Sequence, residues 1–402
     1  MKVEIRPSQA SGTVAAPPSK SLTHRALIAA ALAPGTGTIK NVSPSEDIMA
    51  TMDCLRVLGA RIDFEENRAV VTGLSRDSIP DGAVLPCRDS GSTLRFLIPL
   101  ALTSGKRITF TGSKRLFSRP LTVYEDICRR QGLFFEHGET SLTVQGVLSP
   151  GEYDVPGDVS SQFVSGLCYA LSLLDRASRV ALKPPVESRP YLEITQHLLA
   201  DYGVQVSIQG DQILIPGKQV YLPRDYSIEG DWSNAAFPDA LNLLGGSVEV
   251  TGLPDITCQG DRVYPRYFAA LSQGTPTLDL SDCPDLGPVC FALSAALNGA
   301  TFTGIRRLRL KESDRVAAMT EELAKFGVNA LVTDDTVFIP GNQLHAPAGH
   351  LSGHNDHRIV MALAVLASQT GGVISDAEAV NKSYPAFWHD LENLGIQLTR
   401  NP

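Results

Sequence analysis

Basic side chains stand in or beside polar clusters that precede apolar, helix-like segments. Lys20 and Arg25 lie at the first of these segments, and Arg95 and Arg358 lie at two others. A helix N-terminus carries unpaired N–H groups and a partial positive charge, so it favours capping residues such as Ser or Asp and disfavours cations. Cations at these positions are stabilised when an anion joins them. The pattern therefore predicts sites for phosphate or carboxylate groups.

Two further charged stretches add to this prediction. The segment 115–119 has an arginine at each end, and residues 311–315 read Lys-Glu-Ser-Asp-Arg before an amphipathic segment. Taken alone, the second stretch fits a solvated, charged helix start equally well. Asp285 follows Pro284, and an isolated Asp beside Pro is more often a helix cap than a catalytic base.

The clusters belong to an internal repeat, which indicates the elements that must position them. Six times, a polar cluster is followed by an apolar stretch, a turn and a strand-like run, and a second helix then ends near a glycine. Glycine suits the left-handed position just past a helix end. The clusters span residues 19–25, 89–93, 158–162, 230–234, 282–286 and 354–358, and the glycines are Gly59, Gly132, Gly203, Gly274, Gly327 and Gly395.

The apolar stretches have no polar face, so we expect these helices in a core, surrounded by sheets or sister helices. The second helices, such as residues 321–326, are amphipathic and should cover the outside. A chain of 402 residues is long enough for two domains. Six similar units of helices and strands therefore predict an α/β protein with three units in each domain.

Composition limits the kinds of partner. The net charge of −8 means that the surface as a whole should repel nucleic acid and acidic membranes, so an anion needs a local basic pocket. The seven scattered cysteines contain no Cys-x-x-Cys and indicate neither a zinc site nor a redox pair. Their odd number suits a reducing compartment. With no signal peptide and no transmembrane run, we expect a cytoplasmic protein that needs no metal and no cofactor.

The polar clusters resemble, in order, the motifs of the 5-enolpyruvylshikimate-3-phosphate synthase family of enolpyruvyl transferases. The resemblance covers essentially the whole chain; each motif is weak alone, and six in the family's order are specific. The matching segments are Pro-Ser-Lys20-Ser-x-x-x-Arg25, Asp-Ser-Gly91-Ser-x-x-Arg95, Ser160-Ser161-Gln162, Lys311-Glu-Ser-Asp-Arg315, Asn355-Asp-His357-Arg358 and Lys382-Ser-Tyr-Pro.

This resemblance implies two similar domains, each of three βαβαββ repeats forming an inside-out α/β barrel, with the active site in the interdomain cleft. It also implies that the N-terminal strand joins the C-terminal half. We therefore expect one domain from residues 1–14 plus 227–402 and the other from residues 15–226. The chain should cross between them near residues 13–18 and 223–230.

The reaction that the resemblance implies moves the enolpyruvyl group of phosphoenolpyruvate to the 5-hydroxyl of shikimate 3-phosphate and releases phosphate through a tetrahedral intermediate. Such chemistry needs an acid, a base and fixed positive groups. Asp285 matches the carboxylate that accepts the 5-hydroxyl proton. Glu312, Lys20 and Lys382 are the candidates for protonating C3 of phosphoenolpyruvate, and the sequence does not choose among them. The expected partners are these two small molecules, and a monomer is the family expectation.

The binding residues follow from the same motif positions. The residues expected to hold shikimate 3-phosphate are Lys20, Ser21, Arg25, Ser160, Ser161, Gln162, Ser188, Asp285 and Lys311. The residues expected to hold phosphoenolpyruvate are Lys20, Gly91, Arg119, Gln162, Arg315, Arg358 and Lys382.

Family members are inhibited by glyphosate, which occupies the phosphoenolpyruvate position, and Gly91 leaves room for it. We therefore expect the chain to be a glyphosate target. Three positions depart from the family pattern. Pro18 stands where a Gly often precedes Ser19. Asp89 stands where the family often has Asn and adds a negative charge near phosphoenolpyruvate. Arg307 stands where some members use Asn to reach shikimate 3-phosphate.

Three other functions fit the sequence less well. The enolpyruvyl transferase that acts on UDP-N-acetylglucosamine generally carries a reactive cysteine in the loop that corresponds to residues 112–120, and this loop has none. RNA 3′-phosphate cyclases share part of the architecture, but the net charge and the lack of an aromatic and basic stripe disfavour nucleic acid. A non-enzymatic phosphometabolite-binding protein should have lost the acid–base positions, whereas Asp285, Glu312 and Lys20 are present.

Overall fold

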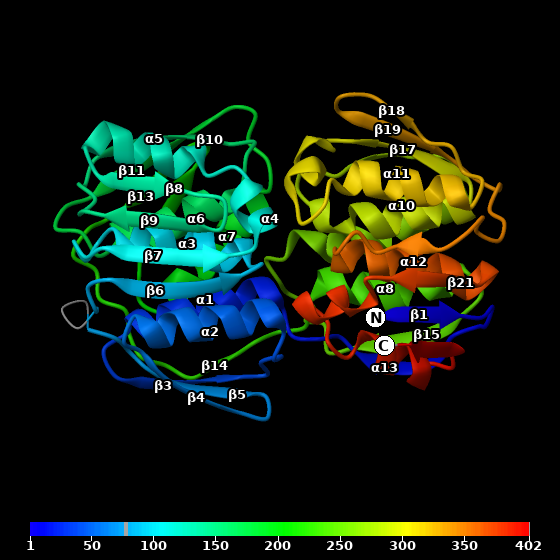
Figure 1. The fold of residues 1–402 in the computed structure, drawn as a ribbon, viewed down its shortest axis with the longest axis horizontal. Helices are drawn as coiled ribbons and strands as arrows, with labels where there is room; N and C mark the ends of the chain where they lie inside the picture. The colour runs from blue at the N-terminus through cyan, green and yellow to red at the C-terminus, as the bar shows by residue number, and fades with distance from the viewer. Residues whose placement is uncertain (76–78, 402) are drawn as a thin grey trace. The chain divides into compact units, whose positions relative to one another are not determined.

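A computed structural model describes residues 1–75 and 79–401. The chain divides into two compact units (Figure 1). The internal unit is the uninterrupted segment Pro18–Glu229, and the terminal unit joins Met1–Pro17 to the chain from Gly230 onward. The last residue of the segment predicted as 227–402 lies outside the described residues.

The internal unit contains three sheets with one pattern. In each, a parallel pair of strands is followed by an antiparallel strand and then by that strand's hairpin partner; the orders are β14-β3-β5-β4, β6-β7-β9-β8 and β10-β11-β13-β12. The elements are α1 (Lys20–Leu32), β3 (Thr36–Lys40), α2 (Glu46–Val57), β4 (Arg61–Glu65), β5 (Arg68–Thr72), β6 (Ala83–Arg88), α3 (Gly91–Ala101), β7 (Ile108–Gly112), α4 (Lys114–Ser118), α5 (Thr122–Gln131), β8 (Phe134–His137), β9 (Ser141–Gln145), β10 (Glu152–Pro156), α6 (Ser161–Leu171), β11 (Ser178–Lys183), α7 (Arg189–Asp201), β12 (Ser207–Gln209), β13 (Gln212–Ile215) and β14 (Tyr226–Ser227).

In the terminal unit, the sheet β16-β17-β19-β18 repeats this pattern. The sheet β20-β21-β1-β22 has the same order of one parallel and two antiparallel pairs, but β1 and β22 come from the two ends of the sequence and form no hairpin. The N-terminal strand β1 fills a middle position in the latter, beside β21 and β22, as the blue arrow beside the orange-red one in Figure 1 shows. The elements are β1 (Lys2–Ile5), β2 (Ser11–Ala15), α8 (Trp232–Leu243), β15 (Ser247–Thr251), η2 (Gly260–Val263), α9 (Tyr264–Gln273), β16 (Thr277–Asp279), η3 (Pro284–Leu286), α10 (Gly287–Ala296), β17 (Gly299–Thr303), η4 (Arg306–Leu310), α11 (Arg315–Lys325), β18 (Leu331–Val332), β19 (Thr336–Pro340), β20 (Leu351–Ser352), α12 (His357–Thr370), β21 (Gly372–Ser375), η5 (Ala377–Lys382), α13 (Phe387–Asn393) and β22 (Leu398–Asn401), where η marks a 3₁₀ helix.

At each of the two crossings between the units, the strand just before the crossing belongs to a different unit from the helix that follows it. β2 lies just before α1 in sequence, yet it pairs with β15 of the terminal unit. β14 lies just before α8, yet it pairs with β3 of the internal unit. Each of these strands therefore provides the first strand of a sheet in the unit that the chain is about to leave: β2 in the terminal unit and β14 in the internal unit. The fourth repeat keeps only the parallel pair β15-β2, because α9 leads directly to β16 of the next sheet, where the other repeats have a hairpin after the second helix.

The polar clusters act as helix caps, as the sequence predicts. The side chains of Ser19, Ser90, Ser160, Asp231 and Asp356 accept hydrogen bonds from backbone N–H groups in the first turns of α1, α3, α6, α8 and α12. The helix α10 differs, because it follows η3 directly and has no side-chain cap. These six helices are buried along most of their lengths and form the two cores.

The helices in the core of the internal unit pack closely. α3 contacts α6, and Gly166 of α6 makes this possible, because a Cβ there would lie 2.5 Å from the backbone oxygen of Arg95. The starts of α1, α3 and α6, which carry most of the predicted binding residues of this unit, are fixed by this core.

Candidate active site

In the internal unit, Lys20 is the first residue of α1. Its ammonium lies 2.8 Å from Oδ2 of Asp47, near the start of α2, and the two side chains are 15% and 9% exposed. The sequence analysis did not identify Asp47 as a site residue, since it lies in a different helix start and outside the matched motifs. A bound anion would have to share Lys20 with this carboxylate.

Arg25 lies one turn further along α1 and is buried. Its guanidinium donates hydrogen bonds to Thr195 Oγ1 (2.8 Å), Ser165 Oγ (3.3 Å) and the backbone oxygens of Ser21 (2.8 Å) and Tyr191 (3.2 Å). Burial lowers the pKa of Arg25 from its ordinary value. The side chain therefore ties α1 to α6 and α7 as well as supplying a positive charge.

Gly91, Gln162 and Arg119 come together beside α3. A Cβ on Gly91 would lie 2.5 Å from Arg119 Nη1, so the backbone of the α3 start touches that guanidinium. Arg95 donates to Gln162 Oε1 (2.8 Å) and to the backbone oxygen of Pro120 (3.3 Å). The sequence pattern predicts an anion at Arg95. The structure shows that Arg95 also holds Gln162, a predicted phosphoenolpyruvate residue, and Pro120, the neighbour of Arg119.

The predicted serines occupy two helix starts of the internal unit. Ser160 caps α6, with its side chain accepting from Gln162 N at 3.3 Å, and Ser161 is the first residue of that helix. Ser188 precedes α7 and adopts a left-handed conformation with φ of 57°. Non-glycine residues adopt this conformation at a cost, which is more often met at functional sites.

In the terminal unit, Asp285 lies among three cations. Its carboxylate is 2.7 Å from Arg315 Nη1, 3.2 Å from Lys311 Nζ and 3.7 Å from Arg358 Nη2. Burial by itself would raise the pKa of Asp285, but Lys311, Arg315 and Arg358 hold it well below its usual range. Asp285 is therefore ionised at neutral pH and oriented by its partners.

Arg315 is the centre of this cluster and is 1% exposed. Besides Asp285, it contacts Glu312 Oε2 at 2.9 Å and Asp356 Oδ2 at 2.9 Å. Burial would raise the pKa of Asp356, yet Arg315 lowers it to about 2. Because Asp356 also caps α12, it fixes Arg315 against the helix start that presents Arg358.

Lys382 ends η5 and donates to the backbone oxygen of Asn355 at 2.8 Å. Arg358 lies in the first turn of α12, with Cζ 5.7 Å from the centre of the Phe237 ring on α8. The structure thus brings together Asp285, Lys311, Glu312, Arg315 and Arg358, and it ties Lys382 to the loop before α12.

A buried carboxyl near the Asp285 cluster was not identified from the sequence. Asp261 of η2 accepts a hydrogen bond from Ser233 Oγ at 3.0 Å, and both are buried. The helix α8 contacts both η2 and η3, which carries Asp285. Burial, with Asp285 nearby, raises the pKa of Asp261 to about 7. No motif marks this residue, because its role depends on neighbours from other repeats.

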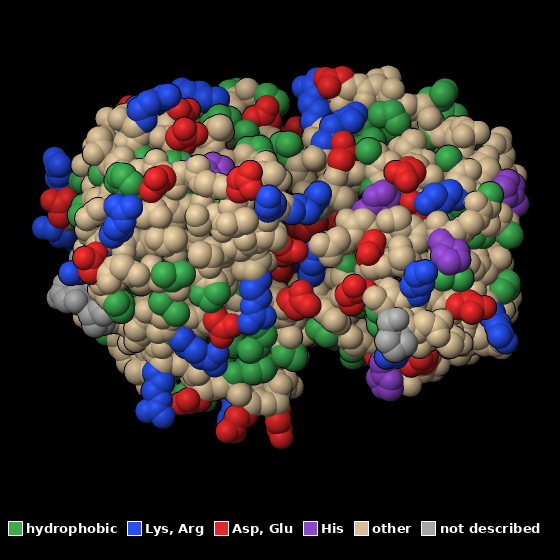
Figure 2. All heavy atoms as spheres, in the orientation of Figure 1, with side chains coloured by type: hydrophobic (Ala, Val, Ile, Leu, Met, Phe, Trp, Pro, Cys, Tyr) green, Lys and Arg blue, Asp and Glu red, His purple; other side chains and the backbone are tan. Residues whose placement is uncertain are grey.

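Figure 2 shows Lys and Arg side chains interspersed with Asp and Glu over the visible face of each unit. In residues 1–75 and 79–401, no helix has the combined length and apolar content needed to cross a lipid bilayer.

One group of side chains in the described part of the chain is close enough to hold a metal ion: Glu321, Glu322 and His354. Glu322 already accepts from Lys325 Nζ at 2.8 Å and 2.9 Å and from Ser352 N at 2.9 Å, and it lies 3.0 Å from His354 Nε2. Its oxygens are thus satisfied by protein donors, and this group lies outside the predicted site residues.

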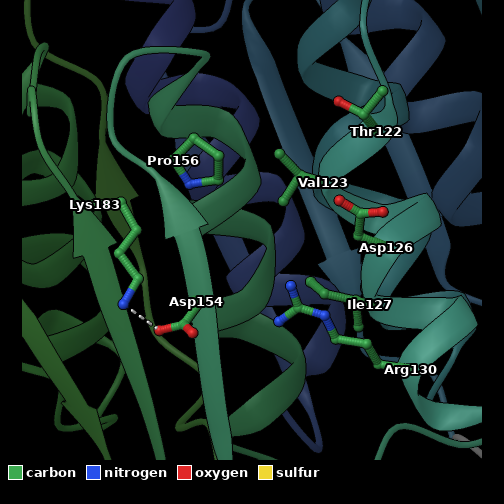
Figure 3. A pocket seen from close by; sticks show the side chains of 8 residues that line it. All are labelled: Thr122, Val123, Asp126, Ile127, Arg130, Asp154, Pro156 and Lys183. Carbon is green, nitrogen blue, oxygen red and sulfur yellow. Dashed lines mark ion pairs between the residues drawn. The ribbon is translucent and has the colours of Figure 1, made fainter.

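A shallow pocket of about 240 Å³ lies elsewhere on the internal unit, between α5 and the strands β10 and β11 (Figure 3). Asp154 and Lys183 line it as an ion pair at 2.8 Å, and Asp126 and Arg130 line it from α5. Its charges balance, and none of the predicted site residues lines it.

Comparison with known proteins identifies relatives over the whole chain. The sequence model of the family described as EPSP synthase (3-phosphoshikimate 1-carboxyvinyltransferase) matches residues 5–391. The chain is 41% identical to a 3-phosphoshikimate 1-carboxyvinyltransferase of Clostridium kluyveri, over 98% of both chains. It is 37% identical to one of Clostridium novyi, over 98% of this chain and 97% of the relative.

Two solved structures of EPSP synthase from Acinetobacter baumannii are also similar. Their TM-scores are 0.77 and 0.78 at 21% and 20% sequence identity, and they cover 99% and 100% of this chain and 100% of their own. This likeness confirms the predicted α/β class and two-domain fold.

Proposed function

The chain belongs to the EPSP synthase (3-phosphoshikimate 1-carboxyvinyltransferase) family, and we infer from this that it transfers the enolpyruvyl group of phosphoenolpyruvate to the 5-hydroxyl of shikimate 3-phosphate, releasing phosphate. The family predicted from the motifs is confirmed, and so is the enzyme class. The reaction belongs to the shikimate pathway, which leads towards aromatic amino acids.

The observation that carries the proposal is Asp285, whose half-buried side chain lies among Lys311, Arg315 and Arg358. A carboxylate held ionised beside cations can accept the proton of a substrate hydroxyl while the same cations bind anionic substrate groups. Anions that bind there compete with Asp285 for its partners. Their arrival weakens the forces that depress the pKa of Asp285, so its basicity rises when both substrates are bound.

We assign the substrate groups to residues of both units. Shikimate 3-phosphate would contact Lys20, Ser21, Arg25, Ser160, Ser161, Gln162, Ser188, Asp285 and Lys311. Phosphoenolpyruvate would contact Lys20, Gly91, Arg119, Gln162, Arg315, Arg358 and Lys382. The burial of Arg25, Arg315 and Arg358 supports this assignment, because cations in a low-dielectric setting attract anions strongly.

The proton for C3 of phosphoenolpyruvate has three candidate donors. The ammonium of Lys20 lies beside Asp47, the carboxyl of Glu312 beside Arg315, and the ammonium of Lys382 beside the Asn355 carbonyl. Of these, the two lysines carry a proton in their ordinary charged form, whereas Glu312 must first receive one.

Phosphate release tests the function directly. We expect release that requires both phosphoenolpyruvate and shikimate 3-phosphate and that EDTA does not change. Tight binding of shikimate 3-phosphate without release would mean that the pocket is kept and the chemistry is lost. Release that depends on UDP-N-acetylglucosamine would assign the chain to the other enolpyruvyl transfer.

We also propose that the chain acts as a monomer in the cytoplasm. The cysteines support the compartment: all seven lie in the described residues, none of them forms a disulfide there, and all but Cys258 are buried. Light scattering on purified protein should give the mass of one chain, and a dimer mass would overturn the monomer.

A further inference from the structure

His24 is a buried titratable residue that the proposed mechanism does not use. It lies on α1 immediately before Arg25 and one turn after Lys20, and it is 1% exposed. Burial, with Lys20 and Arg25 nearby, holds the pKa of His24 well below its usual range. The imidazole is therefore neutral at physiological pH, with one N–H donor and one acceptor nitrogen.

A chain of short hydrogen bonds leads from this ring to the start of α3. His24 Nδ1 lies 2.7 Å from Thr51 Oγ1 on α2, and Thr51 Oγ1 lies 2.7 Å from Thr93 Oγ1 on α3. Thr93 Oγ1 then donates to Ser90 Oγ at 2.7 Å. All four side chains are buried. This series of hydrogen bonds joins α1, α2 and α3 of the internal unit through buried side chains.

The surroundings of the His24 ring indicate in which direction these hydrogen bonds are donated. In the described residues, His24 Nε2 has no hydrogen-bond partner. A buried N–H group without an acceptor is rarer in proteins than an unused acceptor. The proton therefore belongs on Nδ1, which donates to Thr51; Thr51 donates to Thr93, and Thr93 donates to Ser90. Hydrogen bonds that point one way along a buried chain strengthen one another.

The end of this chain adjoins the predicted phosphoenolpyruvate residues. Ser90 caps α3 by accepting from Thr93 N at 3.2 Å, and the next residue is Gly91, which touches Arg119. The His24 ring also packs against Phe96 of α3 in a T-shaped arrangement, at 6.5 Å between ring centres and an interplanar angle of 86°. His24 is thus connected to α3 in two ways: through the Thr51 hydroxyl to Thr93, and by direct packing against Phe96.

We propose that His24 is a positioning residue of this enzyme, which acts through Thr51 and Thr93 to fix the Ser90 cap and thereby the placement of Gly91 beside Arg119. This inference rests on the proposed function, because it concerns the end of the site assigned to phosphoenolpyruvate. It assigns His24 no contact with substrate.

Valine and serine substitutions separate the hydroxyl groups from the packing. Thr93→Val and Thr51→Val each keep the side-chain volume and interrupt the series of hydrogen bonds. We expect each to raise the KM for phosphoenolpyruvate about three- to tenfold. The KM for shikimate 3-phosphate should stay within about twofold. Thr93→Ser and Thr51→Ser keep the hydroxyl and should restore the KM for phosphoenolpyruvate. Thr143→Val is the matched control, because it removes the Thr109–Thr143 hydroxyl pair (3.0 Å) on β7 and β9.

Two substitutions test the ring itself. His24→Phe keeps an aromatic ring against Phe96 but cannot donate to Thr51, so it should raise the KM for phosphoenolpyruvate as the valine variants do. His24→Asn offers an amide donor close to the position of Nδ1 and should stay near the wild-type value. A purely structural role would instead lower the melting temperature and leave the two Michaelis constants unchanged.

Nitrogen-15 NMR of the His24 ring gives a readout that does not depend on activity. We expect the neutral Nδ1–H tautomer in the wild-type protein and a changed Nδ1 signal in Thr51→Val. The opposite tautomer would overturn the inference, as would His24→Phe and valine variants with the wild-type KM for phosphoenolpyruvate. A wild-type protein that releases no phosphate would overturn the proposed function itself, even with the expected NMR signal.

Discussion

A Cβ atom on Gly91 would lie 2.5 Å from Nη1 and 3.0 Å from Cζ of Arg119. Unbonded heavy atoms do not approach so closely, so a side chain at residue 91 forces the guanidinium to move. The atoms it meets are the far end of a flexible side chain, which can shift without unfolding the helix start. The absence of a side chain at Gly91 therefore determines the position of the Arg119 guanidinium.

Gly91→Ala should weaken phosphoenolpyruvate binding and glyphosate inhibition together. The added methyl group displaces Arg119, so we expect the KM for phosphoenolpyruvate to rise about tenfold, as loss of one hydrogen bond to a charged group would produce. The inhibition constant for glyphosate should rise at least as much. Gly274→Ala is a suitable control, because a Cβ there meets open space. Equal glyphosate inhibition of wild type and Gly91→Ala would contradict this account.

Arg119→Ala removes the guanidinium instead of displacing it. A hydrogen bond to a charged group contributes about 1.5–3 kcal/mol, so the KM for phosphoenolpyruvate should rise about 10- to 150-fold. Steady-state kinetics with each substrate varied in turn will measure it. An unchanged KM for phosphoenolpyruvate would remove Arg119 from the site.

Asp285→Ala should reduce turnover and preserve substrate binding. Loss of general acid–base assistance costs about 10²- to 10⁴-fold in kcat. The cations Lys311 and Arg358 remain, so titration of shikimate 3-phosphate should still show binding. Asp334→Asn is the control, because its side chain is 82% exposed and pairs with Arg306 on the surface. Wild-type turnover in Asp285→Ala would end its assignment as the base.

The sequence predicts the helix starts well, because a cap and an apolar run are local signals. Ser90 and Asp356 cap helices where the pattern places them. The exchange of β2 and β14 is harder to predict from local pattern, since β14 has two residues and its pairing with β3 is set by tertiary packing. The family resemblance supplied the N-terminal strand's attachment to the C-terminal half, which local pattern does not carry.

Partners of the site residues are the other part that sequence alone does not reveal. Lys20 meets Asp47, and Arg315 meets Asp356, across separate helix starts. Arg315 and Asp356 belong to two separate motifs, and neither motif shows that the two side chains touch. Asp261 belongs to no motif, and its role is visible only once α8 places Ser233 beside it.

Asp261 should make the stability of the protein depend on pH. Its pKa is raised from 3.8 to about 7, chiefly by burial and then by Asp285. Between these values the folded protein binds a proton that the unfolded chain has lost. The contribution of Asp261 to stability is therefore fully present below pH 3.8 and is lost as the pH rises through about 7.

Asp261→Asn removes this dependence, because the amide cannot ionise and can still accept from Ser233. The quantity to follow is the free energy of unfolding of Asp261→Asn minus that of the wild type. From pH 5 to 7 this difference should increase by about 1.4 kcal/mol per pH unit, and above pH 7 it should level off. Urea unfolding at several pH values measures it, with Asp255→Asn in an exposed loop as control. A constant difference from pH 5 to 8 would mean that Asp261 is ionised throughout, and the buried carboxyl would then have to be balanced by Arg358, which also faces it.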